Sequence, residues 1–130
     1  MIEVVLVEEV SISKKILVAD DDQRITLLMK IKLEEKGYAV MTAQDGEEAL
    51  EKVRTEKPDL LLLDVNMPKL DGDQVYMTLR AQPETKKLPI LMLTGLRTEE
   101  EVEAEHDENM FSKPVKFEKL FARMRQILGQ

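Results

Sequence analysis

Five short hydrophobic runs divide the chain at fairly regular intervals. Two of them, 15–20 (KILVAD) and 59–64 (DLLLLD), are apolar at almost every position, and 88–94 (LPILMLT) is a third of this kind. Weaker runs lie at 38–43 (YAVMTA) and 109–112 (NMFS). Continuous apolar runs of this length are typical of parallel strands that are covered on both faces. The pattern therefore predicts five largely buried strands.

The segments between these runs repeat apolar residues at the spacing of an α-helix. Three of them are DGEEALEKV (45–53), DQVYMTLRAQ (73–82) and FEKLFARMRQIL (117–128). The segment TEEEVEAEHDE (98–108) holds seven acidic residues and few apolar ones, so we expect only a short, weakly anchored helix there. The helix after the first run shows its apolar face as the stripe Ile25, Leu28, Met29 and Leu33, and it is expected to end at Gly37.

Strands that alternate with helices build βαβ units, and parallel crossovers are right-handed in nearly all proteins. The sequence therefore predicts an α/β fold, a doubly wound five-stranded parallel sheet with five helices. We divide the chain into an N-terminal extension of unknown role (1–13) and one domain (14–130). The extension contains IEVVLVEEV, which could form an extra edge strand, a docking segment or a disordered tail.

Composition narrows the function classes. A length of 130 residues suits one domain, and the formal charge of −7 argues against direct binding to nucleic acid or to an anionic membrane. Cysteine is absent, which excludes disulfides, thiolate metal sites and cysteine nucleophiles. The N-terminus lacks the basic start of a signal peptide, and no apolar run approaches the ~20 residues of a membrane span. We therefore expect a cytoplasmic protein.

Polar residues that could take part in binding or catalysis lie where the predicted strands end. Asp20 and Asp21 follow the first strand, Asp64 ends the third, Thr94 ends the fourth, and Lys113 follows the fifth. In open α/β sheets, ligands bind beyond the carboxyl ends of the strands, where these positions converge. A single Asp after a strand is most often a turn or cap residue. Five polar residues at matching strand ends are hard to explain by capping.

This set of residues suits phosphoryl transfer assisted by a hard divalent cation. Mg²⁺, with Mn²⁺ as a possible substitute, prefers carboxylate and water oxygens, and its charge would offset the repulsion among clustered aspartates. A carboxylate can itself act as the nucleophile and form an aspartyl-phosphate. Lys113 would then neutralise the added phosphoryl charge, and the Thr94 hydroxyl could bond a phosphoryl oxygen.

With these motifs in order, the chain resembles the receiver domain of bacterial two-component response regulators, including chemotaxis receivers. ILVADDD resembles the acidic strand, LLLLDVNMPKLDG the phosphoacceptor strand and loop, PILMLTG the switch-threonine strand, and FSKPV the lysine–proline motif. The resemblance runs from about Lys15 to Leu128. It implies the flavodoxin-like strand order 2-1-3-4-5.

The resemblance also implies roles for individual residues. Asp64 would be the phosphoacceptor, Thr94 the switch hydroxyl and Lys113 the ion-pair partner of the phosphoryl group. The Lys113–Pro114 peptide is expected to be cis. The implied metal ligands are Asp21 directly, Asp20 mainly through water, Asp64, and the backbone carbonyl of Asn66.

On this basis we expect a phosphorylation-switched signalling domain. A histidine kinase, a phosphotransfer protein or a small acyl phosphate would donate the phosphoryl group to Asp64. The chain would catalyse only this transfer to itself and its own dephosphorylation. Output would pass to a downstream protein partner or to an effector domain outside this chain.

The sequence departs from the family pattern where such domains couple to their output. Many receivers carry Tyr or Phe three residues before the lysine, and here that residue is Met110. Phe111 stands next to it, but adjacent strand residues point to opposite faces, so it is not a simple substitute. Gly95 follows Thr94 where alanine is common, and the interval of 19 residues from Thr94 to Lys113 is short.

These departures motivate an alternative function, a protein-docking module that does not signal through phosphorylation. Two other functions, one enzymatic and one cofactor-binding, have less support. A haloacid-dehalogenase-like phosphatase would place a second Asp two residues after the nucleophile, where this chain has Asn66. A flavodoxin-type FMN site would need a Ser/Thr/Gly-rich loop after the first strand, and none is present.

The remaining charged residues are expected to be structural. Asp22 is placed to cap the first helix, Asp71 and Gly72 to open a later one, and His106 to lie exposed among acids. The last helix carries basic residues that would face the acidic segment, either within one molecule or across a homodimer. These residues are Lys116, Lys119, Arg123 and Arg125.

Overall fold

The computed structural model describes residues 13–129, in which five parallel strands alternate with five helices. The strands form one sheet in the order β2-β1-β3-β4-β5, which confirms the order implied by the family resemblance. The elements are β1 (Lys15–Ala19), α2 (Gln23–Glu35), β2 (Ala39–Ala43), α3 (Gly46–Glu56), β3 (Leu60–Asp64), α4 (Gly72–Ala81), β4 (Ile90–Thr94), α5 (Glu99–Ala104), β5 (Met110–Ser112) and α6 (Phe117–Leu128).

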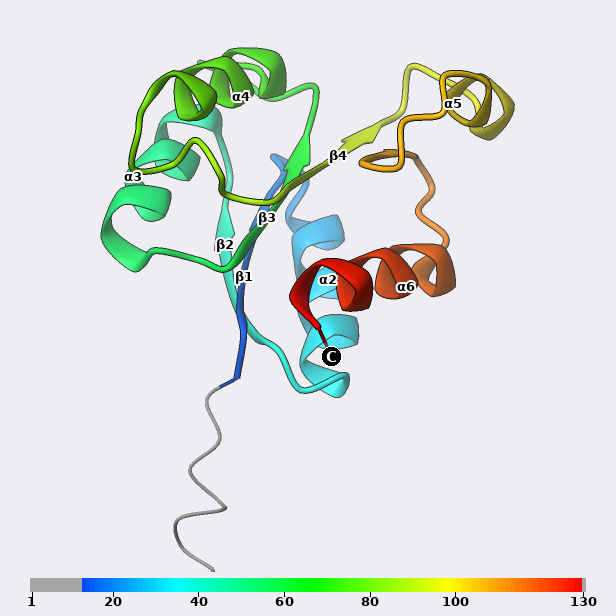
Figure 1. Ribbon diagram of the computed structural model, residues 1–130, viewed down its shortest axis with the longest axis horizontal. Helices are drawn as coiled ribbons and strands as arrows, with labels where there is room; N and C mark the ends of the chain where they lie inside the picture. Colours follow the sequence, from blue (N-terminus) through cyan, green and yellow to red (C-terminus); the bar gives the residue numbers. More distant parts are fainter. Residues whose placement is uncertain (1–12, 130) are drawn as a thin grey trace, which may run out of the picture.

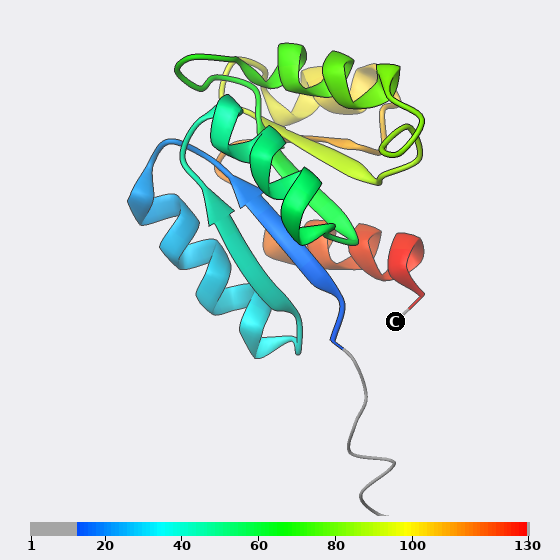
Figure 2. The same ribbon diagram turned by 90° about the vertical axis from the view of Figure 1, so that its left-hand side faces the viewer.

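The two faces of the sheet are covered by different helices. Ile16 and Val18 of β1 pack into the cluster that includes residues of α2 and α6. Leu17 and Ala19 pack into the cluster that includes residues of α3 and α4. Figure 1 and Figure 2 show the sheet between these two helix pairs. Side chains of a strand alternate between faces, so the continuous apolar runs fill both layers at once.

The predicted strands are present, and two of them are shorter than predicted because local polar contacts end them. All five residues of β3 and of β4 are buried. The first run ends as a strand at Ala19 instead of Asp20, because an Asp20 carboxylate oxygen accepts the Asp22 N–H at 2.9 Å and turns the chain. Asp59 lies outside β3, and its carboxylate accepts the Lys15 N–H at 2.7 Å.

Helices α2, α3 and α4 begin at aspartate caps, and α2 is followed by the glycine that was expected to end it. The Asp22 carboxylate accepts the Arg24 N–H at 2.9 Å, which confirms Asp22 as the N-cap of α2. After that helix, Gly37 has a φ of 94°, a left-handed conformation that glycine adopts without strain. Asp45 caps α3, and Asp71 caps α4 with a full capping box.

The expected apolar stripe of α2 is wrong at one position. Met29 and Leu33 are buried, but Leu28 is 47% exposed. Thr26 takes the buried place instead, with its hydroxyl donating to the Gln23 carbonyl at 3.0 Å. The buried face is therefore rotated away from Leu28, and a threonine that satisfies its own hydroxyl can occupy it.

The acidic segment forms the short helix that was expected. α5 has six residues, and Val102 is its one buried residue. Basic residues of α6 contact it within the same molecule: Lys116 lies 2.9 Å from Glu99, and Lys119 lies 3.2 Å from Glu99 and 3.1 Å from Glu103. Intramolecular ion pairs therefore account for part of the charge pairing. Among the described residues, no helix is long and apolar enough to span a membrane.

Candidate functional site

The carboxyl edge of the sheet brings three aspartates together. β1 and β3 are paired neighbours, with Ala19 opposite Leu63, so Asp20 and Asp64 stand side by side just beyond that pair. Carboxylate oxygens of Asp20, Asp21 and Asp64 lie within 4.8 Å of one another. Asp20 and Asp64 are buried, whereas Asp21 is exposed at the mouth of the cluster. The site therefore has two interior carboxylates and one that solvent reaches.

Lys113 joins the two buried carboxylates. Its ammonium nitrogen lies 2.7 Å from an oxygen of Asp20 and 3.1 Å from an oxygen of Asp64. The backbone fixes this lysine in place, because the Lys113 N–H donates to the Thr94 carbonyl at 2.7 Å. The following peptide to Pro114 is cis, as expected. The contact with Asp20 was not foreseen, since the sequence gives no sign of which strand end the lysine reaches.

The protonation behaviour of the site reflects burial and charge. Burial, and next the charge of Asp20, raise the pKa of the Asp64 carboxyl above its usual value near 3.8, although Lys113 offsets part of this effect. Burial disfavours the Lys113 ammonium, but Asp20 and then Asp64 raise its pKa on balance. Three carboxylates against one ammonium leave an excess of negative charge. A divalent cation would balance that excess, so the donor set fits Mg²⁺.

Asp22 is separate from this cluster. Its backbone N–H donates to Asp20, but its carboxylate points to the start of α2 and pairs with the Arg24 side chain at 3.2 Å. The hydrogen bond from the Arg24 side chain is the main cause that lowers the pKa of Asp22. The three consecutive aspartates therefore divide into two cluster members and one helix cap.

Two further expected residues lie beside the cluster. Thr94 is buried at the end of β4, and its hydroxyl oxygen accepts the Leu96 N–H at 3.1 Å. That bond leaves the hydroxyl proton of Thr94 available as a donor. Asn66 is exposed, and its backbone N–H donates to an Asp64 oxygen at 3.4 Å.

Two glycines support the loop after Asp64. A Cβ atom on Gly72 would lie 2.4 Å from the Asp64 carbonyl oxygen, so only glycine lets α4 begin this close to the acidic cluster. A Cβ atom on Gly46 would lie 2.1 Å from the Leu70 carbonyl oxygen. The Asp-Gly pair in the sequence signalled the turn at Gly72. Gly46 also follows an aspartate, but that pair does not reveal its contact with Leu70, which depends on the packing of the start of α3 against a distant loop.

Met110 and Phe111 face opposite sides of the sheet, as expected for adjacent strand residues. Met110 packs against the cluster beneath α3 and α4. Phe111 packs against the cluster beneath α2 and α6. Both are half-buried. Phe111 is therefore on the wrong face to take the place that an aromatic residue at position 110 would have.

Comparison with known proteins identifies the class. A family model described as the response regulator receiver domain matches residues 16–125. The chain belongs to this family, and its strand order and acidic edge agree with that assignment. The match shows a receiver domain of the two-component type, for which a Mg²⁺ site in an acidic pocket is typical.

Curated relatives include the alkaline phosphatase synthesis transcriptional regulatory protein PhoP of Bacillus subtilis. It is 48% identical over 120 residues, which cover 89% of this chain and 49% of that protein. The response regulator MprA of Mycobacterium ulcerans is 42% identical over 119 residues, which cover 89% and 50%. The chain thus spans about half the length of these relatives.

Solved structures agree in fold. The chemotaxis protein CheY4 of Vibrio cholerae superposes with a TM-score of 0.76 and 34% identity, covering 89% of this chain and 99% of that one. The receiver domain of the Francisella response regulator 1452 gives a TM-score of 0.77 and 32% identity, covering 90% and 98%. This chain therefore corresponds to nearly the whole of a separately solved receiver domain.

Proposed function

We propose that Asp64 accepts a phosphoryl group and that this modification switches the signalling state of the domain. The observation that carries the proposal is the position of Asp64, buried beside Asp20 and in contact with the Lys113 ammonium. Burial raises the pKa of this carboxyl, so the ionised side chain is held at a free-energy cost. Such a perturbed carboxylate is typical of a functional site, and it is consistent with a role in holding a cation and in accepting a phosphoryl group.

We further propose that Mg²⁺ is held by Asp21 and, more indirectly, by Asp20, with an Asp64 oxygen and the Asn66 carbonyl completing the protein ligands. The close approach of the three carboxylates supports this assignment. When bound, the ion supplies positive charge that stabilises the phosphoryl oxygens during transfer. Asp21 is the exposed member, and exposure suits a direct ligand of an ion that keeps several waters.

In the proposed reaction, a carboxylate oxygen of Asp64 attacks the phosphorus atom of the donor. A new oxygen–phosphorus bond forms, and the bond between phosphorus and the donor's leaving group breaks. The Lys113 ammonium then pairs with a phosphoryl oxygen. To do so, it leaves its present position between the carboxylates of Asp20 and Asp64. The Thr94 hydroxyl donates to another phosphoryl oxygen, and later attack by water on the phosphorus restores the carboxylate.

The donor would be a histidine kinase, a phosphotransfer protein or a small acyl phosphate. The chain catalyses only its own phosphorylation and dephosphorylation in this proposal. A relative about twice as long is named a transcriptional regulatory protein. We infer that output passes to an effector domain outside this chain or to a separate protein partner. The alternative of docking without phosphorylation is not favoured, because the family match accompanies a complete cluster of carboxylates and lysine.

The test is intact-mass measurement after incubation with acetyl phosphate and Mg²⁺. The wild type should gain the mass of one phosphoryl group, and chelation of the metal should prevent the gain. Asp64→Asn should show no gain. Asp73→Asn is the matched control, because Asp73 is an exposed acid in the first turn of α4 and should label normally. Equal labelling of Asp64→Asn and the wild type would refute the assignment.

A further inference from the structure

The loop between β3 and α4 (65–71) is held against the start of α3. Gly46, the first residue of α3, lies so close to this loop that a Cβ atom on it would be 2.1 Å from the Leu70 carbonyl oxygen and 2.5 Å from the Leu70 Cβ. The Leu70 side chain also packs against the apolar cluster that contains Ala49 of α3. Packing therefore fixes the end of the β3–α4 loop against α3.

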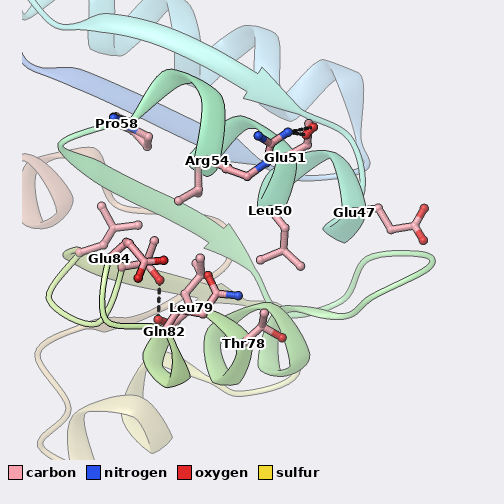
Figure 3. A pocket seen from close by; sticks show the side chains of 13 residues that line it. Glu47, Leu50, Glu51, Arg54, Pro58, Thr78, Leu79, Gln82 and Glu84 are labelled. Carbon is pink, nitrogen blue, oxygen red and sulfur yellow. Dashed lines mark hydrogen bonds and ion pairs between the residues drawn. The ribbon is translucent and has the colours of Figure 1, made fainter.

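Lys69 adds ion pairs to this contact. Its Nζ lies 3.4 Å from a carboxylate oxygen of Asp45 and 3.7 Å from one of Glu47, the residues on either side of Gly46. Figure 3, a view of the groove between α3 and α4, shows Glu47 at the start of α3, near the loop that leads into α4. The Asp45 carboxylate also accepts the Glu48 N–H at 2.8 Å. The helix therefore holds one partner of Lys69 in a fixed position.

The backbone of Lys69 indicates that these contacts constrain the loop. Its φ is 70°, in the left-handed region that residues other than glycine seldom adopt. Such conformations persist where the surrounding structure outweighs their cost, and they gather at functional sites. The middle of the β3–α4 loop is thus held by its contacts with α3 rather than by the conformational preference of its own residues.

The start of the same loop carries a proposed metal ligand. Asn66, three positions before Lys69, offers its backbone carbonyl to Mg²⁺ in the function proposed above. Its own hydrogen bond to the acidic cluster is long, 3.4 Å from its N–H to an Asp64 oxygen. The direction of the Asn66 carbonyl therefore depends on the path of the loop beyond it. Because Mg²⁺ demands near-ideal octahedral geometry, a small displacement of one oxygen ligand lowers the affinity.

We propose that Lys69 and Gly46 are positioning residues for Mg²⁺, because they hold the β3–α4 loop in the conformation that directs the Asn66 carbonyl at the ion. Neither residue touches the metal. This inference rests on the proposed function, in which the acidic cluster holds Mg²⁺. The charge of Lys69 makes it testable. Through-space repulsion alone would make Mg²⁺ bind more tightly once this charge is removed, whereas loss of positioning makes Mg²⁺ bind more weakly.

The test is calorimetric titration of the full-length chain with Mg²⁺. Loss of a group that orients a metal ligand typically lowers affinity by about 10- to 100-fold. Lys69 is 58% exposed, so we expect a smaller effect, a rise of about fivefold in the Kd of Lys69→Met. Lys69→Arg keeps the cation and should bind Mg²⁺ as the wild type does. Lys86→Met is the matched control, because it removes the same charge from an exposed lysine that precedes β4, at the opposite edge of the sheet.

Gly46→Ala gives a second test in which no charge changes. The added methyl group displaces the Leu70 carbonyl, so the Kd for Mg²⁺ should rise in this variant too, with circular dichroism to establish that it is folded. At saturating Mg²⁺, Lys69→Met should be labelled by acetyl phosphate at the wild-type rate, because only its affinity for the metal has changed.

The outcomes separate this inference from the proposed function. A Kd of Lys69→Met equal to or below that of the wild type would overturn the positioning role while the metal site stands. An unchanged Kd in Gly46→Ala, or slower labelling of Lys69→Met at saturating Mg²⁺, would also contradict it. A wild type that binds no Mg²⁺ would overturn the proposed metal site and the positioning role together.

Discussion

Lys113 allows the most demanding test of the electrostatics of the site. Its ammonium contacts both Asp20 and Asp64, whose side chains are 1% and 6% exposed. Lys113→Met keeps the apolar stem and removes the charge. Two buried carboxylates would then face each other without a cation. Removing one partner of a buried ion pair costs about 3–5 kcal/mol, and we expect about 3 kcal/mol because Lys113 remains 20% exposed.

The loss of stability in Lys113→Met should depend on pH, and the ionisation of Asp64 determines whether it increases or decreases as pH rises. Lys113 lowers the pKa of Asp64, so its removal raises that already elevated pKa further. A carboxyl with a raised folded-state pKa contributes stability when it is protonated, and this contribution is lost as pH rises through the folded-state pKa. The deficit of Lys113→Met should therefore be small near pH 4 and reach its full size near pH 7.5.

The assay is urea unfolding followed by circular dichroism at both pH values. Asp64→Asn in the Lys113→Met background should recover much of the loss, since it removes one of the opposed charges. Lys119→Met is the matched control: Lys119 also contacts two acids, but it is 52% exposed and screened by solvent, so its removal should cost far less stability than Lys113→Met. A loss in Lys113→Met that is below about 1 kcal/mol, or that is the same at both pH values, would refute the reasoning.

Four further predictions concern a glycine contact, a helix cap, the charge of Asp64 and Mg²⁺ binding. Gly46→Ala should cost about 2 kcal/mol in thermal unfolding, because its Cβ would lie 2.1 Å from the Leu70 carbonyl oxygen. Asp71→Ala removes the cap of α4 and should cost about 1 kcal/mol in the same assay. The wild type should lose stability between pH 4 and pH 7, because the pKa of Asp64 is raised and its carboxyl ionises in the folded protein over that range. Asp64→Asn lacks this loss, so its stability relative to the wild type should increase from pH 4 to pH 7 in urea unfolding. Mg²⁺ at about 100 times its Kd should stabilise the wild type by about 2.7 kcal/mol, and at the same concentration Asp21→Asn should show less than half of that gain.

The hydrophobic pattern was sufficient to predict the strands and most helices. β3 and β4 are buried at every position, which agrees with the parallel sheet covered on both faces that their apolar runs predicted. The helix caps at Asp22 and Asp71 were also readable, because capping depends on residues only two or three positions apart. Leu28 was assigned wrongly, since which side of α2 faces the sheet depends on how the helix is rotated against its neighbours.

The residues of the acidic cluster were readable from their positions at strand ends, but their contacts were not. Lys113 and Asp20 are separated by 93 positions, and their 2.7 Å contact exists only because β5 and β1 end at the same edge of the sheet. The need for glycine at position 46 depends likewise on a loop that packs against it from β3. The sequence by itself determined the strands, the caps and the chemical groups, since these depend on neighbours along the chain. Only the tertiary structure decided which charges meet, because contacts between distant segments depend on how strands and helices pack.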